Sequence, residues 1–467
     1  APLAYQISET QEVYRMSAWY DNSVFYHMYP LGMTGAPKEN HAEAAAGRVR
    51  QLDEWIPHLV RLGISALYIG PLFESTKHGY DTRDFRLVDR RLGTNEDFRN
   101  FVRLCHDAGI RVVVDGVFNH TGREFFAFRD IQENREHSPY RDWYKNVNFW
   151  QGSPLGDSFS YEAWQGHFEL AALNLKNPEV CSYLLDAVSF WVKEFDIDGI
   201  RLDCANVLDF DFMKALRAHC DRLKPDFWLM GEVIHGDYSR WANSSMLHSV
   251  TNYELHKGLY SGHNDYNCFE IAHTIRRQSD ENGGIYRGIN LYTFVDNHDE
   301  DRIMSKLKNK KHIFTVYTML FTLPGIPSVY YGSEWGIEGA RTPYCDDMLR
   351  PAVSPEQISE LNELHQDISS HVRDLAHIHK AHPALCTGEY RELLLTNRQY
   401  AYARLSDSEQ IITAVNIDDG AALLNFRLPS GGSEAVDLQT GEPVSVENGQ
   451  LSLQLEGCES KILKIVG

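Results

Sequence analysis

The stretch Arg111-Val112-Val113-Val114-Asp115-Gly116 (RVVVDG) is a short apolar run rich in β-branched residues, and it follows an amphipathic segment from Asn95 to Ala108. Such a run after a segment of helical period is typical of a parallel strand that follows a helix. Residues 65–70 (SALYIG) repeat the pattern after the amphipathic segment from Ala45 to Leu62. The two repeats predict a parallel sheet covered by helices.

Six further short apolar runs share this pattern between Ser23 and about residue 335. They are Val24–Tyr29, Gly199–Asp203, Trp228–Glu232, Ser249–Tyr253, Leu291–Asp296 and Ser328–Tyr331. Eight strands that alternate with helices predict an α/β fold, namely a (β/α)8 TIM barrel. The active site of such a barrel gathers at the carboxyl ends of its strands.

Two parts of the sequence depart from the regular alternation. The third and fourth strands are separated by far more residues than one crossover helix needs, and residues 120–174 are rich in aromatic and charged side chains, so we expect an inserted lid domain after strand 3. Beyond Pro383, short alternating runs broken by Gly, Asp and Asn predict a C-terminal antiparallel β-sandwich. The expected limits are 1–22 for an N-terminal extension, 23–119 and 175–382 for the barrel, 120–174 for the lid and 383–467 for the sandwich.

Composition and charge restrict the class of ligand. The 65 acidic residues outnumber the 45 basic residues, and the resulting net charge of −20 repels nucleic acid and anionic membrane surfaces. A neutral substrate is therefore expected, with neither nucleic acid nor membrane as a partner. Aromatic residues make up 12% of the chain, which suits the flat apolar faces of sugars as well as an ordinary core.

The sequence also bears on redox state and location. The eight cysteines are scattered without a C-x-x-C pair, so we interpret them as free thiols that are mostly buried. No apolar stretch approaches the length of a membrane span, and residues 1–15 lack the features of an export signal. A cytoplasmic location is favoured, secretion after processing stays open, and so does Met16 as the natural start.

Four acidic residues stand at the ends of predicted strands: Asp115, Asp203, Glu232 and Asp299. Strand ends converge on one pocket in a barrel, where like charges raise one another's pKa, as acid/base catalysis requires. A structural salt bridge explains any one of them equally well, but the set of four favours catalysis. The side chains of Asp203 and Glu232, on neighbouring strands, suit double displacement, which needs carboxyl groups about 5 to 5.5 Å apart.

Other polar residues accompany these carboxylates. Arg201 lies two residues before Asp203 on the same strand face, where it would keep Asp203 ionised or serve as an ordinary structural pair. The histidines at 78, 120 and 298 lie near strand ends without the short spacing of a zinc motif. Hydrogen bonding to a hydroxyl-rich substrate is therefore the favoured interpretation. Tyr80, on a loop after the second strand, suits stacking under a sugar ring or ordinary packing.

Four of these segments resemble, in order, the motifs of glycoside hydrolase family 13, the α-amylase family. They are Asp115–His120 (DGVFNH), Gly199–Asp203 (GIRLD), Gly231–Val233 (GEV) and Phe294–Asp299 (FVDNHD). Residues 325–332 (GIPSVYYG) are similar to the family's eighth-strand motif. Four motifs in the right order, each at a predicted strand end, make the resemblance specific.

The resemblance implies a role for each matching residue. Asp203 is expected to be the nucleophile, Glu232 the general acid/base and Asp299 a third carboxylate that binds sugar hydroxyls and helps to distort the ring. The expected substrate-binding residues are His78, Tyr80, Asp81, Asp115, His120, Arg201 and His298. No cofactor is required, although Asn119 matches a calcium ligand of many α-amylases and leaves a calcium site open.

Residues 125–144 and 173–180 resemble the branch that holds neopullulanases, cyclomaltodextrinases and maltogenic amylases. That branch usually has an extra N-terminal domain, whereas the predicted barrel begins almost at once here. Ala171 and Ala172 stand where the branch has Pro-Lys, and Val207 stands where it has Glu. The departures leave substrate size and oligomeric state open, with a homodimer as one option.

The leading hypothesis is a retaining hydrolase of α-1,4 glucosidic bonds in maltooligosaccharides, cyclomaltodextrins or other cyclic glucans, with α-1,6 bonds left open. The alternative that keeps the chemistry is an α-glucanotransferase that passes the same glycosyl-enzyme intermediate to another sugar. The alternative of another class is a non-catalytic sugar-binding relative. That alternative is disfavoured because no catalytic carboxylate is missing.

Overall fold

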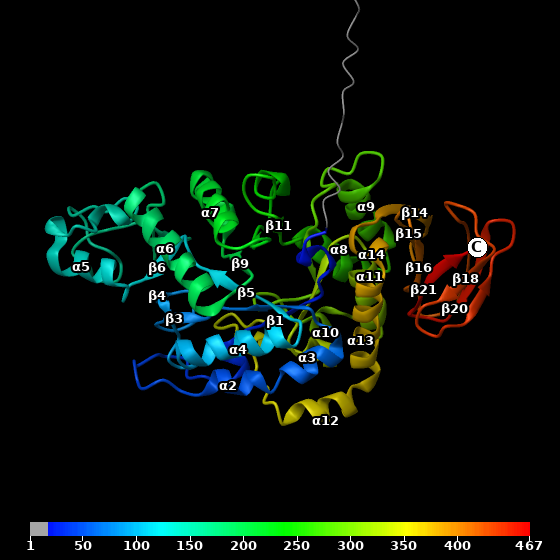
Figure 1. The fold of residues 1–467 in the computed structure, drawn as a ribbon, viewed down its shortest axis with the longest axis horizontal. Helices are drawn as coiled ribbons and strands as arrows, with labels where there is room; N and C mark the ends of the chain where they lie inside the picture. The colour runs from blue at the N-terminus through cyan, green and yellow to red at the C-terminus, as the bar shows by residue number, and fades with distance from the viewer. Residues whose placement is uncertain (1–16) are drawn as a thin grey trace, which may run out of the picture.

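The computed structural model of the chain describes residues 17–467 and is built around eight parallel strands (Figure 1). Their order in the sheet is β11-β10-β9-β5-β2-β1-β13-β12. A parallel bridge between Thr251 and Tyr292 brings the two edge strands together. The predicted (β/α)8 barrel is thereby confirmed. The strands are β1 (Phe25–Met28), β2 (Ala66–Ile69), β5 (Arg111–Gly116), β9 (Gly199–Leu202), β10 (Trp228–Gly231), β11 (Ser249–Val250), β12 (Tyr292–Phe294) and β13 (Ile326–Tyr330).

Helices surround the barrel, and local sequence sets where they begin. The helix α4 starts at a reciprocal cap, in which Thr94 accepts the N–H of Asp97 while the Asp97 carboxylate accepts the N–H of Thr94. The segment from Ala45 to Leu62, expected to be amphipathic throughout, forms two short helices, and Pro57 lies in the first turn of the second. The helices are α2 (Arg48–Asp53), α3 (Ile56–Leu62), α4 (Asn95–Asp107), α6 (Pro178–Phe195), α7 (Phe210–Leu223), α8 (Tyr253–Asn264), α9 (Cys268–Ser279), α11 (His312–Thr322), α12 (Gln357–Leu364) and α13 (Gln366–Ala381).

The lower interior of the barrel is filled by apolar side chains from alternate strand positions. Phe25 of β1 and Trp228 of β10 pack with ring centroids 4.9 Å apart, and Tyr20 stacks on Trp228 from below. Because successive strand residues point to opposite faces, the side chains two positions further along also point inward. The barrel mouth therefore receives the residues at which these strands end. The lower layer consists of Phe25, Ala66, Tyr68, Val113, Trp228, Met230, Tyr292, Phe294 and Ile326.

An excursion between β5 and β9 lies at one end of the molecule (Figure 1). It contains the helix α5 (Phe126–Asn134) and a three-stranded sheet of β6 (His120–Gly122), β7 (Ala163–Trp164) and β8 (His167–Ala172). Strand β6 pairs with β8 so that His120 lies opposite Ala172. The excursion thus begins directly beyond the barrel mouth, and the expected domain limits stay a prediction from the sequence.

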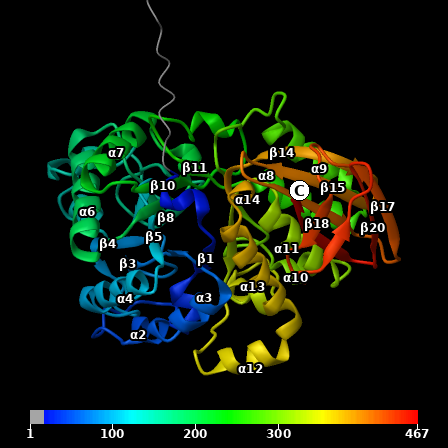
Figure 2. The same ribbon diagram turned by 45° about the vertical axis from the view of Figure 1, so that its right-hand side comes forward.

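The C-terminal strands lie at the opposite end of the molecule from α5 (Figure 1), and Figure 2 shows them on the side away from α4 and α6. A six-stranded sheet and a two-stranded sheet, β17 with β20, enclose an aliphatic core. This arrangement confirms the predicted antiparallel β-sandwich, which follows the short helix α14 (Pro383–Thr387). The strands are β14 (Glu389–Leu395), β15 (Gln399–Leu405), β16 (Gln410–Asn416), β17 (Ala422–Arg427), β18 (Glu434–Asp437), β19 (Pro443–Ser445), β20 (Gln450–Leu455) and β21 (Glu459–Val466).

The cysteines and the apolar helices can also be compared with the sequence-based expectations. All eight cysteines are free and most are buried, as predicted, although Cys345 is exposed. Within residues 17–467, no helix is both long and apolar enough to cross a lipid bilayer. The open question of Met16 as the natural start, and most of the expected N-terminal extension, lie outside the described residues.

Candidate active site

The ends of three neighbouring strands deliver four charged side chains to the barrel mouth. Asp115 of β5 lies in register with Arg201 of β9. Asp203 follows β9, and Glu232 follows β10 with its N–H donating to the carbonyl of Leu202 at 2.9 Å. The β-sheet register therefore sets Asp203 and Glu232 beside one another, as predicted for adjacent strand ends.

The Arg201 guanidinium group contacts three of these carboxylates. Its Nη1 donates to Oδ1 of Asp115 and to Oδ1 of Asp203, both at 2.9 Å, and its Nη2 lies 3.1 Å from Oε2 of Glu232. The Arg201 side chain is only 4% exposed. Because one planar group contacts both Asp203 and Glu232, their carboxyl groups lie close together and are held in fixed orientations.

Asp299 forms the more open side of the site, with a side chain 36% exposed. Its Oδ1 accepts a hydrogen bond from Arg350 Nη2 at 3.0 Å, and its Oδ2 lies 3.2 Å from Nε2 of His298. The Nε of Arg350 donates to the backbone carbonyl of His298 at 3.0 Å. Arg350 therefore fixes both the third carboxylate and the loop that carries it.

Two tyrosine hydroxyl groups converge on Asp115. The Tyr80 hydroxyl lies 2.7 Å from Nε2 of His298 and donates to Oδ2 of Asp115 at 3.2 Å. The Tyr68 hydroxyl donates to the same oxygen at 2.7 Å. Gly70 leaves room for this arrangement, because a Cβ there would lie 2.2 Å from Oδ2 of Asp115. Tyr80 is buried and hydrogen bonded, and its stacking on a sugar stays a prediction.

The remaining predicted residues lie around the loop of Tyr80. Nε2 of His120 lies 3.1 Å from the carbonyl of Tyr80, so His120 is part of the site. The Asp81 carboxylate accepts the backbone N–H groups of Lys77 and Gly79, which stabilises the turn, and its substrate contact stays a prediction. His78 is further out, with a side chain 39% exposed and its Nδ1 accepting the N–H of Tyr80.

The expected calcium site at Asn119 also stays a prediction. The side-chain amide of Asn119 contacts Nδ1 of His120 at 3.1 Å, and its backbone carbonyl accepts the N–H of Leu173. These contacts of Asn119 connect the barrel mouth to the inserted sheet.

Burial and neighbouring charges give Asp203 and Glu232 different pKa values. Burial raises the pKa of Glu232 to about 7, since the opposing influence of Arg201 is offset by the charges of Asp203 and Asp299. Burial likewise raises the pKa of Asp203 to about 6, against the lowering influence of Arg201. Near neutral pH, Asp203 is therefore mostly ionised while Glu232 keeps a substantial protonated fraction.

His120 and His298 are neutral imidazoles. Burial lowers the pKa of His298 well below its usual range, and the nearby charges of Arg201 and Arg350 lower it further. Burial also lowers the pKa of His120 to about 4. A neutral imidazole both donates and accepts hydrogen bonds, which suits contacts with hydroxyl groups.

Two residues of the site were not predicted. Tyr68 lies on β2 at an inward position two residues before Gly70, so strand parity could have found it. Arg350 lies in an irregular segment after β13 that has no periodic pattern. Its guanidinium group packs over the ring of Tyr29, 4.5 Å from the centroid, a contact that only tertiary structure defines.

Comparisons with known proteins agree with this geometry. Residues 38–380 match the family described as "Alpha amylase, catalytic domain". A cyclomaltodextrinase from a Bacillus species is 29% identical over 434 residues, which cover 87% of this chain and 75% of that protein. A solved cyclomaltodextrinase structure superposes with a TM-score of 0.84 at 26% identity, covering 96% of this chain and 78% of the other. A debranching enzyme from Nostoc punctiforme gives a TM-score of 0.76 at 28% identity, covering 95% and 98%.

Proposed function

The chain belongs to the α-amylase family of glycoside hydrolases, and from that premise we propose that it hydrolyses α-1,4 glucosidic bonds with retention of configuration. The observation that carries the proposal is the pairing of Asp203 and Glu232 on the single guanidinium group of Arg201. Such a pair offers one ionised and one protonated carboxyl group to the same bond. Two carboxyl groups with these roles are what double displacement needs.

In the first step, the carboxylate of Asp203 attacks the anomeric carbon while Glu232 gives its proton to the departing glycosidic oxygen. The glycosidic bond breaks, a glycosyl ester forms on Asp203, and Glu232 becomes a carboxylate. In the second step, Glu232 takes a proton from water, the hydroxide oxygen bonds to the anomeric carbon, and the ester bond breaks. Asp203 is then a carboxylate again and Glu232 an acid, so the site is restored.

The surrounding residues position the sugar. Asp299, fixed by Arg350, presents a partly exposed carboxylate for ring hydroxyls. The neutral imidazoles of His120 and His298 add hydrogen-bonding groups, and Arg201 holds Asp203 in its attacking orientation. Such hydrogen bonds and ionic contacts accelerate the reaction most when they become stronger as the sugar ring distorts toward the transition state.

For the substrate we propose maltooligosaccharides and cyclomaltodextrins. Its support is the likeness to proteins named cyclomaltodextrinase, over most of this chain. The likeness to a protein named debranching enzyme makes α-1,6 bonds a second target for the assay. The cytoplasmic location and the homodimer option remain predictions from the sequence.

An α-glucosyl fluoride, whose fluoride leaves without protonation, separates the two carboxyl roles. We expect Glu232→Gln to form the glycosyl ester from this substrate at a substantial rate, while it hydrolyses a maltooligosaccharide very slowly. Asp203→Asn is expected to fail with both substrates. Intact-protein mass spectrometry should show a glucosyl adduct on Glu232→Gln and none on Asp203→Asn. Equal activity of the two variants on the fluoride would overturn the assignment of roles.

The product pattern decides between hydrolysis and transfer. We expect cyclomaltodextrin to give linear maltooligosaccharides whose first-formed reducing ends are α by proton NMR. A β product would exclude retention. At high substrate concentration, oligomers longer than the input would favour the glucanotransferase instead, and pullulan and panose in the same panel report on α-1,6 cleavage.

A further inference from the structure

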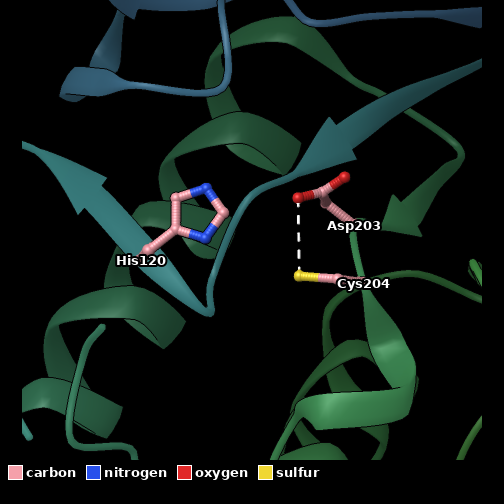
Figure 3. A group of neighbouring side chains, drawn as sticks. All are labelled: His120, Asp203 and Cys204. Carbon is pink, nitrogen blue, oxygen red and sulfur yellow. Dashed lines mark hydrogen bonds between the residues drawn. The ribbon is translucent and has the colours of Figure 1, made fainter. Parts of the chain in front are cut away.

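Cys204 directly follows the proposed nucleophile and turns its thiol back toward it. Its backbone is left-handed, with φ 38° and ψ 51°, a conformation that is uncommon for a residue with a side chain. In an extended strand the side chains of Asp203 and Cys204 would point to opposite faces. The turn instead brings Sγ of Cys204 to 3.6 Å from Oδ2 of Asp203 (Figure 3).

The imidazole of His120 completes a group of three potential metal ligands. One ring nitrogen of His120, one carboxylate oxygen of Asp203 and Sγ of Cys204 all lie within 4.8 Å of one another. Figure 3 shows the nitrogen-bearing edge of the ring turned toward the other two side chains. Arg201 occupies Oδ1 of Asp203, and Oδ2 is the oxygen that lies beside the thiol.

The chemistry of these donors selects the kind of ion. Calcium and magnesium prefer sets of oxygen ligands, whereas thiolate and imidazole together favour Zn²⁺ and similar divalent ions. Zinc accepts three protein ligands plus water, with bonds of about 2.0 to 2.3 Å, so modest side-chain rotations would close the triad around one ion. We propose that His120, Asp203 and Cys204 form a binding site for Zn²⁺-like ions. An ion bound there inhibits the enzyme because it coordinates the carboxylate of the proposed nucleophile.

The protonation states fit this proposal. The carbonyl of Tyr80 can only accept a hydrogen bond, so its contact with Nε2 of His120 leaves the lone pair on Nδ1. A backbone carbonyl that holds the second ring nitrogen is the usual support of a metal-bound histidine. Binding would exchange the contact between Nδ1 and the amide of Asn119 for a bond to the ion.

The thiol must lose its proton when the ion binds. Zn²⁺ and the Cys204 thiol give a zinc–thiolate bond and one proton, which leaves to solvent. Burial raises the pKa of Cys204, and the charges of Asp203 and Glu232 add to this effect, so the free thiol is protonated. The charge of the ion offsets that penalty, and the apparent affinity should rise with pH.

The charged side chains around the triad also favour a bound cation. Asp115, Glu232 and Asp299 lie around the triad beside Asp203, against the two guanidinium groups of Arg201 and Arg350. The Asp203 side chain is 15% exposed, so its carboxylate is accessible to an ion from solvent. A net negative pocket raises the local concentration of divalent ions.

Direct binding tests the site without any substrate. Co²⁺, which reports its ligands by absorption, is titrated into the whole protein and into Cys204→Ala, Cys204→Ser and Cys345→Ala. Cys345 is the exposed thiol and serves as the matched control. We expect a thiolate-to-cobalt charge-transfer band in the wild type and in Cys345→Ala, displaced by Zn²⁺, and its loss in both Cys204 variants. A band that survives in the two Cys204 variants, with their fold verified by circular dichroism, would overturn the site.

The inhibitory consequence rests on the proposed glucan hydrolysis and is measured separately. Zn²⁺ should inhibit the wild type, and a chelator should restore its activity. In Cys204→Ala the inhibition constant for Zn²⁺ should rise by about tenfold or more. Each rate is compared with the metal-free rate of the same variant. Equal inhibition constants would refute the mechanism. If the cobalt band appears but no glucan is cleaved, the proposed function fails and the metal site stands; if glucans are cleaved without a band, the site fails alone.

Discussion

The lower interior of the barrel and its mouth are built by the same strands but from opposite kinds of residue. Strand β5 gives Val113 to the lower layer and Asp115 to the mouth. Strand β10 gives Trp228 and Met230 to the lower layer, and Glu232 follows at the mouth. Two residues of chain separate a tightly packed apolar layer from a cluster of buried charges.

The two layers contribute to opposite properties of the molecule. The apolar layer stabilises the fold by removing surface from water, at roughly 25 cal/mol for each Å² buried. The charged layer costs stability, because burial raises the pKa of Asp203 and Glu232 and Arg201 compensates only in part. In the proposed mechanism these two perturbed carboxyl groups are the nucleophile and the acid, so changes in the two layers should have separable effects.

The largest effect is expected from Asp203→Asn at the mouth. If Asp203 is the covalent nucleophile, as proposed, its removal should lower kcat by about 10⁴-fold or more. The folded pKa of Asp203, about 6, lies above its ordinary value of 3.8, so the ionised carboxyl destabilises the native state above pH 6. Asn removes that charge, and Arg201 keeps Asp115 and Glu232 as partners. Thermal unfolding at pH 7 should therefore show equal or higher stability, and a variant that loses activity by unfolding would contradict the separation.

The second effect belongs to the lower layer. Trp228 is fully buried and packs on Phe25, so Trp228→Ala should lower the free energy of unfolding by about 3 to 5 kcal/mol. Urea unfolding measures that loss, and activity per folded molecule should fall far less than in Asp203→Asn. Leu423→Ala, at an exposed position of the sandwich, is the matched control and should change stability little. A Trp228→Ala variant that is as stable as the wild type would show that the lower layer is not what holds the barrel.

Sequence patterns predicted the barrel and its mouth only where the strands are regular. Strand period and order were sufficient to find the eight strands and to set Asp115, Asp203 and Glu232 at strand ends. Parity placed Arg201 on the same face as Asp203, because parity is local information. Arg350 and the left-handed turn at Cys204 depend on contacts between distant segments and on one backbone dihedral. Neither leaves a periodic trace, so the sequence did not indicate the clamp on Asp299 or the triad with His120.

The third effect tests the irregular side of the mouth. Arg350→Gln removes a charged hydrogen bond to Asp299 and the support of the His298 carbonyl. Hydrogen bonds to charged groups contribute about 1.5 to 3 kcal/mol, so kcat/KM should fall by roughly 10- to 100-fold. Arg276→Gln, which breaks an exposed pair with Glu392, is the control and should leave kcat/KM unchanged. Equal kinetics for the two variants would mean that Asp299 needs no clamp.

The smallest effect is the pH dependence of the wild type near neutrality. The proposed mechanism requires Asp203 ionised and Glu232 protonated, so kcat/KM should decline as pH falls through about 6 and as it rises through about 7. The two carboxyl groups share Arg201 and titrate as a pair, which makes the profile a narrow bell whose limbs belong to the pair. Between its maximum and pH 7 the change should be only about 1.3-fold. Rates on a maltooligosaccharide measure the profile, with circular dichroism at each pH to show that the fold is intact. A flat profile from about pH 5 to pH 8 would mean that burial in the charged layer does not shift the pKa values of its carboxyl groups. The contrast between the charged and the apolar layer would then not explain catalysis.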